Sequence, residues 1–246
     1  MPKFFVVSDI HSFYTEFREA LDAAGFDPND ESHWLVTCGD NFDRGRQSAE
    51  VMRYLLNLPR KVLVRGNHEQ LLMECLDRGY PLWYDGSNGT MQTVMDLAGR
   101  DVDEFDIACT QIHPRVKKFV DQTVNYFETK NYIFVHGWIP LKDLTFDSKW
   151  RESHQSEWDE ATWHNGMEMA IRGFIEPNKT IVCGHFHTSW GHHRKDGSPE
   201  WGERANFTPY HSHGIIAIDG CTAYSGRCNV IVLEDEFLES DKNGNN

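Results

Sequence analysis

Short apolar runs, rich in β-branched and aromatic residues, alternate along the chain with longer segments of helical spacing. Each run ends in Gly, Asp, Asn or His, residues that favour the turn after a strand. This pattern predicts strands over Lys3–Ser8, His33–Cys38, Lys61–Arg65, Tyr132–Val135, Thr180–Cys183, Gly214–Ile218 and Asn229–Leu233.

Two segments between the first three runs place apolar residues on one helical face, Phe13–Ala24 and Ser48–Leu58. Strands that alternate with helices in this way predict right-handed crossovers and a largely parallel sheet. Further helices are expected in a peripheral helical part near residues 70–130, over Gln70–Arg78, Thr90–Leu97 and Pro114–Phe127.

The 246 residues contain no fixed-period repeat and no Pro- or Gly-rich linker, so we expect one domain over residues 1–238. Hydrophobic residues make up 39% and charged residues 25% of the chain, which is typical of a globular protein with a core. Residues 239–246, ESDKNGNN, have no apolar periodicity and predict a disordered tail.

The formal net charge of −14 argues against nucleic-acid partners and anionic lipid. An anionic substrate would need local positive charge, which bound divalent cations and a few arginines can supply. The sequence has no stretch near eighteen consecutive apolar residues, and its start lacks the pattern of a secretory signal. We therefore expect a cytoplasmic protein with no membrane partner.

The cysteines are scattered and form no CxxC pair, so buried reduced thiols are favoured over disulfides or zinc knuckles. The six positions are Cys38, Cys75, Cys109, Cys183, Cys221 and Cys228.

Polar residues that can bind metals follow five of the predicted strands. Taken singly, each group is weak: an Asp-x-His can be a surface turn, GDNFDRG a capped turn and GHFH a pair of core histidines. The carboxyl ends of strands in open α/β sheets nevertheless converge on ligand sites, so together the groups predict one site. The residues are Asp9, His11, Asp40, Asp43, Asn67, His68, His136, His185 and His187.

Oxygen and imidazole donors without thiolates suit a pair of divalent ions, with Mn most favoured and Fe or Zn as alternatives. A carboxylate can bridge two ions, and Asp40 is the candidate bridge. Two metals lower the pKa of a shared water, so the predicted nucleophile is a metal-bridging hydroxide that attacks its substrate directly.

Five segments in order, DIHSFYTEF, GDNFDRG, RGNHE, VHGW and GHFH, resemble the five blocks of the calcineurin-like metallophosphoesterases. GDNFDRG with RGNHE is most similar to the phosphoprotein phosphatase branch, which includes bacterial and phage serine/threonine phosphatases. AIDGCTAYSGRCNVIVLED resembles the closing strands of the same branch. The resemblance implies an α/β fold, the metallophosphoesterase-type αββα sandwich of two mixed sheets flanked by helices.

The resemblance also assigns roles to the strand-end residues. It implies a general acid, His68, oriented by Asp43, and phosphate binding by Arg44, Arg65 and Asn67. It implies a first metal held by Asp9, His11, Asp40 and His187, and a second held by Asp40, Asn67, His136 and His185.

The chain departs from the branch at several positions. Ser8 and Ser12 flank the first motif where glycine is usual, and Trp138 stands where a glycine is common, so its ring is expected to border the site. A second phosphate-binding arginine of the branch has two candidates here, Arg151 and Arg172.

Other conspicuous residues leave alternatives open. Trp83, Asn88 and Thr90 line a substrate cleft or belong to a glycine-rich turn. Trp158, Trp163 and His164 stack on a substrate ring or pack in the core or at its rim. Four later histidines are expected at the rim or surface, namely His192, His193, His211 and His213.

The leading prediction is a metal-dependent phosphomonoesterase acting on phosphoserine or phosphothreonine in proteins. A hydrolase of dinucleoside polyphosphates or other nucleotides is the alternative enzyme. A binding scaffold that has lost catalysis is a third alternative, which the complete set of expected site residues disfavours. The expected partner is a phosphorylated protein or a small phosphoester.

Overall fold

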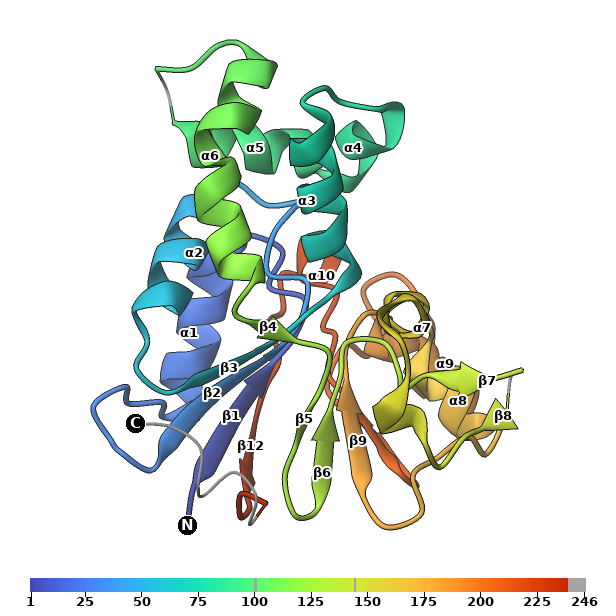
Figure 1. Ribbon diagram of the computed structural model, residues 1–246. Coiled ribbons are helices and arrows are strands. Elements are labelled where there is room, and N and C mark those ends of the chain that lie inside the picture. Colours follow the sequence, from blue (N-terminus) through green and yellow to red (C-terminus); the bar gives the residue numbers. More distant parts are fainter. Residues whose placement is uncertain (100, 144, 239–246) are drawn as a thin grey trace.

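The structure, a computed structural model, describes residues 1–99, 101–143 and 145–238. Two five-stranded sheets lie side by side with helices outside them (Figure 1). The first sheet has the order β12-β1-β2-β3-β4, and β12 is its one antiparallel member. Its strands are β1 (Lys3–Val7), β2 (His33–Cys38), β3 (Lys61–Val64), β4 (Thr123–Val124) and β12 (Val230–Glu234).

The second sheet has the order β10-β11-β9-β6-β5, with β11, β9 and β6 parallel and a strand running antiparallel to them at each edge. Its strands are β5 (Phe127–Glu128), β6 (Tyr132–Phe134), β9 (Thr180–Cys183), β10 (Tyr210–Ser212) and β11 (Ile215–Ala217). A separate hairpin is formed by β7 (Leu141–Lys142) and β8 (Thr145–Phe146).

Side-chain alternation along the strands divides the core into three layers. Phe4 and Val6 of β1 meet Phe134 of β6 and Val182 of β9 between the two sheets. Phe5 of β1 points the other way, into the layer beneath the helices of the first sheet. The predicted αββα sandwich of two mixed sheets is therefore confirmed.

Helices cover the outer faces of both sheets. The first sheet is covered by α1 (Tyr14–Ala24) and α2 (Ser48–Asn57), which bury the predicted apolar stripes. Residues of α7 (Gln155–Ala161) and α8 (Gly166–Ile171) pack with those of the second sheet, and α9 (Thr188–Asp196) contacts β10. A single 3₁₀ turn, Trp150–Glu152, precedes α7.

The remaining helices lie toward the carboxyl ends of β1, β2 and β3 (Figure 1). They are α3 (Asn67–Arg78), α4 (Trp83–Asn88), α5 (Thr90–Ala98), α6 (Phe105–Val120) and the short α10 (Thr222–Ser225). No helix in the described ranges is long and apolar enough to cross a membrane. The peripheral helical part is where the sequence predicted it.

The predicted helix over Pro114–Phe127 is wrong at both ends. In the structure α6 begins at Phe105, carries Pro114 in its interior and ends at Val120. Burial of Ala108, Ile112 and Phe119 along one face outweighs the backbone hydrogen bond that a proline removes. Beyond Val120 the chain is extended and forms β4 and β5.

The cysteine prediction is confirmed, since all six thiols are free and five of them are buried. The single domain stays a prediction, and the predicted tail over 239–246 lies outside the described residues. Trp138 does not border the site as expected. It is only 1% exposed, its indole donates to the carbonyl of Phe174 at 2.9 Å, and it packs in the core of the second sheet.

A buried carboxylate ties the end of β12 to the turn between β5 and β6. Asp235 is 2% exposed, and it accepts bonds from the Thr129 hydroxyl at 2.7 Å and from the backbone N–H of Asn131 at 2.8 Å. These bonds lower the pKa of Asp235 against the effect of its burial. The carboxylate thereby joins the two sheets at the end where β1 starts.

Asp235→Ala should lower the free energy of unfolding by about 3 kcal/mol, because buried bonds to an ionised group are lost. Glu236→Ala is the matched control. Its carboxylate pairs with Lys130 at 3.2 Å on the exposed surface, so the change should cost less than about 1 kcal/mol. Urea denaturation of both variants measures the difference, and equal losses would contradict the bracing role of Asp235.

Candidate metal centre

Several of the strand-end residues of the predicted site have left-handed backbone. L-residues adopt this conformation only at a cost, so the surrounding bonds must hold it. The N–H of Asp9 donates to the carbonyl of Gly39 at 3.1 Å, and that of His11 donates to the carbonyl of Asp40 at 2.9 Å. Residues with positive φ include Asp9 (53°), His11 (48°), Asp40 (55°), Asp43 (74°), Arg44 (64°) and His185 (66°).

Two glycines let the ends of β2 and β3 touch backbone to backbone. A Cβ on Gly66 would lie 2.1 Å from Oδ1 of Asp40, and a Cβ on Gly39 would lie 2.7 Å from Cα of Gly66. No other residue fits at either position without displacing the site. The close approach brings Asp40 onto the first turn of α3.

Glu69, which the sequence analysis did not single out, braces this junction. Its fully buried carboxylate accepts backbone N–H groups of Asp40 at 3.0 Å, Asn41 at 2.8 Å and Gly66 at 2.7 Å. Burial raises the pKa of Glu69, and the nearby Asp40 charge raises it further. The only sequence signal was a carboxylate three residues after Gly66, the spacing of a capping box.

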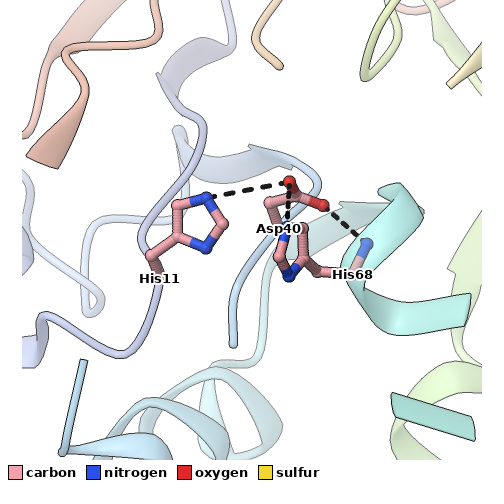
Figure 2. Close-up of side chains that lie close together, drawn as sticks. All are labelled: His11, Asp40 and His68. Atoms are coloured by element: carbon pink, nitrogen blue, oxygen red, sulfur yellow. Dashed lines mark hydrogen bonds and ion pairs between the residues drawn. The ribbon is translucent and has the colours of Figure 1, made fainter. Parts of the chain in front are cut away.

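Asp40 lies between His11 and His68 (Figure 2). Its Oδ2 is 3.8 Å from Nε2 of His11 and 3.9 Å from Nε2 of His68, while its Oδ1 accepts the backbone N–H of His68 at 3.0 Å. Ligand atoms of these three residues all lie within 4.8 Å of one another. The carboxyl ends of β1, β2 and β3 therefore converge, as the sequence predicted.

Asp40 belongs to a second such group with His136 and His185. Nε2 of His136 lies 3.3 Å from Oδ2 of Asp40 and 2.9 Å from Oδ1 of Asn67. The rings of His136 and His185 have their centroids 5.1 Å apart. One carboxylate thus stands in two separate groups of candidate ligands, which is the arrangement that a bridging ligand requires.

The Nδ1 hydrogen bonds of His11 and His136 turn Nε2 of each ring toward the Asp40 carboxylate, where Nε2 of His136 also meets Oδ1 of Asn67. Nδ1 of His11 donates to the carbonyl of Phe42 at 2.9 Å, and Nδ1 of His136 donates to the carbonyl of Cys38 at 2.7 Å. A carbonyl can only accept, so the second nitrogen keeps its lone pair when the ring is neutral. A backbone carbonyl behind a histidine is the usual support of a metal ligand.

Asp9 faces the same cluster. Its Oδ1 lies 3.8 Å from Nε2 of His11, and its Oδ2 accepts the Ser8 hydroxyl at 2.5 Å and the backbone N–H of His185 at 2.9 Å. Ser8, one of the departures from the family pattern, therefore orients a candidate ligand. Burial raises the pKa of Asp9 to about 6, even though His136 acts against that rise.

The charged groups of the cluster strongly shift one another's pKa values. Burial acts to raise the pKa of Asp40, but His136 and His68 outweigh it and hold that pKa well below its usual range. Burial would lower the pKa of His136, yet Asp40 raises it to about 10. Burial and the neighbouring His136 lower the pKa of His185 to about 3. Divalent cations would supply the positive charge that the buried carboxylates require, so the residues present fit such ions.

His187 is placed differently from the other predicted ligands. Its Nδ1 lies 2.9 Å from the Ser189 hydroxyl, its Nε2 lies 3.4 Å from Glu200, and its ring centroid lies 4.4 Å from that of Trp201. It is absent from both ligand groups found in the described residues. Its role as a ligand to the first metal therefore stays a prediction.

The predicted acid and its orienting carboxylate are in contact. Nδ1 of His68 donates to Oδ2 of Asp43 at 2.7 Å, and both side chains are almost wholly buried. Burial acts to lower the pKa of His68, but Asp40 and Asp43 raise it above its usual value. His68 is itself a member of the first ligand group, so the pair is part of the cluster.

The predicted phosphate-binding arginines differ in whether another side chain already engages them. Arg44 is exposed and forms no ion pair with the described residues, whereas Nε of Arg65 donates to the Thr123 hydroxyl at 3.0 Å. Arg151 is paired with Glu128 at 2.6 Å, and Arg172 is paired with Glu168 on its own helix. Both candidates for the second arginine are therefore occupied by carboxylates.

The structure distinguishes between the alternatives left open for the conspicuous aromatic and histidine residues. Trp158 is buried in the core, whereas Trp163 is 52% exposed and meets the His185 ring edge-on at 5.9 Å. Trp83 is 85% exposed at the start of α4. His192 and His193 bond to backbone carbonyls at the surface, and His211 and His213 are exposed.

Asp219 is a buried carboxylate that the sequence analysis missed. It follows β11, and its Oδ1 accepts the backbone N–H of Cys221 at 2.6 Å. Burial raises its pKa well above the usual range, and Asp9 adds to the effect. The same rule that found Asp9, an acidic residue directly after an apolar run, would have found it.

Comparison with known proteins agrees with this geometry. A family model described as calcineurin-like phosphoesterase matches residues 2–189. Solved structures of similar fold include a candidate diadenosine tetraphosphatase, with a TM-score of 0.59, 18% identity and coverage of 95% of this chain and 91% of that one. A protein-tyrosine phosphatase of a psychrophilic Shewanella has a TM-score of 0.54 and 17% identity, with coverage of 95% and 76%.

Two kinds of curated relatives match the sequence. The symmetrical bis(5'-nucleosyl)-tetraphosphatase of Aromatoleum aromaticum is 35% identical over 103 residues, which cover 39% of this chain and 34% of the relative. Serine/threonine-protein phosphatase 2 of Salmonella typhimurium is 25% identical over 185 residues, which cover 73% and 78%. The chain thus matches about a third of the length of the first relative and most of the second.

Adding Mn²⁺ to chelator-treated protein should raise its melting temperature. A ligand at a hundred times its Kd stabilises the folded state by about 2.7 kcal/mol, or roughly 5–10 °C for a chain of this size. His136→Ala should lose most of this gain, whereas His192→Ala should keep it. Differential scanning calorimetry measures the gain, and an undiminished gain in His136→Ala would rule out this site as its origin.

Glu69→Gln should lower the free energy of unfolding by about 2–4 kcal/mol, because an amide NH₂ then faces backbone N–H donors. It should also reduce the bound metal per chain, since Asp40 loses its brace. Glu74→Gln on the same helix is the control, because Glu74 is exposed and accepts a bond from the Gln70 side chain at 2.8 Å. Urea denaturation and elemental analysis give the two readouts; unchanged values for Glu69→Gln would refute the brace.

Proposed function

The chain belongs to the calcineurin-like phosphoesterase family, and we propose that this metal-dependent phosphoesterase acts on phosphoserine and phosphothreonine in proteins. The observation that carries the proposal is the buried His68–Asp43 pair, which lies against a carboxylate shared by two ligand groups. A proton donor fixed beside a candidate metal pair suits hydrolysis of an ester whose leaving oxygen is a strong base.

The proposed ligands fall into two sets that share Asp40. The first set is Asp9, His11, Asp40 and His187, and the second is Asp40, Asn67, His136 and His185. Mn²⁺ is the proposed ion, because carboxylate and imidazole donors without thiolate suit it. When bound, two such ions lower the pKa of water and neutralise the charge of a phosphoryl group.

His68 is the proposed general acid. Its Nδ1 is engaged by Asp43, so the proton that it can release to a leaving oxygen is the one on Nε2. The raised pKa of His68 keeps that proton in place near neutral pH. Geometry alone would also allow Nε2 to bind a metal, and measuring the metal content of a His68 variant separates the two roles.

Arg44 is the proposed main anchor of the phosphoryl group. Its guanidinium is exposed beside Asp43, and such a planar fork of donors matches two phosphate oxygens. Arg65 and Asn67 are the proposed secondary contacts. Local cations of this kind are needed because the chain as a whole has a net charge of −14 and repels anions.

The choice of a phosphoprotein substrate is supported by the extent of the likeness. The match to serine/threonine-protein phosphatase 2 covers 78% of that relative, whereas the match to the dinucleoside tetraphosphatase of Aromatoleum aromaticum covers 34%. A dinucleoside polyphosphate is the second candidate, because the exposed Trp163 beside His185 could stack on a nucleobase.

With Mn²⁺ bound, the protein should hydrolyse a phosphothreonine peptide with a kcat/KM about tenfold or more above that for diadenosine tetraphosphate. The comparison uses phosphate release from the peptide and chromatography of the nucleotides, at equal metal loading. A preference for the dinucleotide would favour the second candidate substrate, a dinucleoside polyphosphate. Absence of hydrolysis of every phosphoester would support a binding scaffold instead.

His68→Asn should slow turnover of the phosphothreonine peptide by about 10²–10⁴, the contribution of general acid catalysis. Its metal content should remain that of the unchanged protein. Steady-state kinetics and elemental analysis of the same sample test this pair of expectations. Loss of metal together with activity would show that His68 is a ligand rather than the acid.

A further inference from the structure

A threonine from outside the strand ends bonds directly to Asp43. Thr90, the first residue of α5, donates its hydroxyl to Oδ2 of Asp43 at 2.8 Å. Nδ1 of His68 donates to the same oxygen at 2.7 Å. Thr90 and Asp43 are fully buried and His68 is 3% exposed, so the three side chains form a chain of bonds shielded from water.

The two oxygens of Asp43 are unequal. Oδ2 receives both donors, whereas Oδ1 is buried and has no hydrogen-bond partner among the described residues. Two donors converging on one oxygen fix the rotation of the carboxylate about its Cβ–Cγ bond. Without the Thr90 hydroxyl, His68 would be the one side chain left to hold that orientation.

The backbone holds Thr90 against the turn that carries Asp43 and Arg44. Gly89 has a φ of +90°, and a Cβ there would lie 2.2 Å from the backbone nitrogen of Arg44. One turn further along α5, the Thr93 hydroxyl accepts the backbone N–H of Asp43 at 3.0 Å. The start of α5 therefore seats directly on the left-handed pair Asp43 and Arg44.

We propose that Thr90 is a positioning residue, which holds Asp43 so that His68 presents Nε2 to the leaving oxygen. Thr90 acts through Asp43 and is assigned no contact with the substrate. The inference rests on the role proposed above for His68. It extends the acid pair into a relay of three residues contributed by the turn after β2, the start of α3 and the start of α5.

The proton balance makes the relay testable through the leaving group. Water adds its oxygen to phosphorus and releases a proton to solvent. As the bond from phosphorus to the leaving oxygen breaks, its electron pair stays on that oxygen, which takes the proton from Nε2 of His68. Solvent then returns a proton to the ring. A serine or threonine alkoxide is a strong base and needs this proton, whereas 4-nitrophenolate is a weak base and leaves without it.

Thr90→Val, which keeps the shape and removes the hydroxyl, should slow the phosphothreonine peptide by about 10- to 100-fold and p-nitrophenyl phosphate by less than about threefold. Thr90→Ser should restore the peptide rate. In ¹⁵N-histidine-labelled, metal-free protein, the Nδ1 proton of His68, identified by its absence in His68→Asn, should shift in Thr90→Val and return in Thr90→Ser.

Thr129→Val is the matched control. It removes a threonine-to-aspartate bond of the same kind, at 2.7 Å, from the buried Asp235 near the start of β1. It should destabilise the protein to a similar extent, but it should not slow the phosphothreonine peptide more than p-nitrophenyl phosphate. A Thr90→Val defect that is equal for both substrates, with an unmoved His68 resonance, would overturn the role of Thr90 while His68→Asn still discriminates. If His68→Asn does not discriminate, the proposed acid fails and the relay with it.

Discussion

The burial of several carboxylates is the constraint on which this structure depends. Asp9, Asp40, Asp43, Glu69 and Asp219 are all at most 6% exposed; the four aspartates belong to segments that follow strands, and Glu69 to the first turn of α3. Burying one ionised carboxylate is costly, and neighbouring like charges add to the cost. The raised pKa values of Asp9, Glu69 and Asp219 express this cost directly.

The fold offsets that cost in a different way for each carboxylate. Glu69 is satisfied by backbone amides, which carry no net charge and also lock two strand ends together. Asp43 accepts one imidazole and one hydroxyl at Oδ2, while its buried Oδ1 has no partner among the described residues. Asp40 is stabilised by the imidazoles of His136 and His68, and Asp9 has one hydroxyl and one amide. Divalent ions at Asp9 and Asp40 would take over the role of the imidazole charge, so structural need and catalytic use coincide at these two residues.

Sequence reasoning succeeded where a residue's chemistry and its place in the pattern agreed. Asp9, His11, Asp40, His68, His136 and His185 each follow an apolar run. The structure places all of these except Asp9 in the two ligand groups, and Asp9 lies beside His11. It failed where contacts depend on packing. Nothing local indicates that Thr90 reaches Asp43, because that bond requires α5 to seat on a turn far away in the chain. Helix α6 was misplaced because Pro114 was taken as a start, although the buried face around it decides the helix.

The position of β1 has a consequence for how the protein is made. This strand precedes β2 and β12 in the chain, yet it lies between them, with Lys3 opposite Glu234. During translation one edge of β1 must wait until β12 has left the ribosome. Pairing between such distant segments folds slowly, and an open apolar edge invites association with other nascent chains. Asp9, two residues beyond β1, therefore acquires its final surroundings only after β12 has been made, which makes late assembly of the site a property of the topology itself.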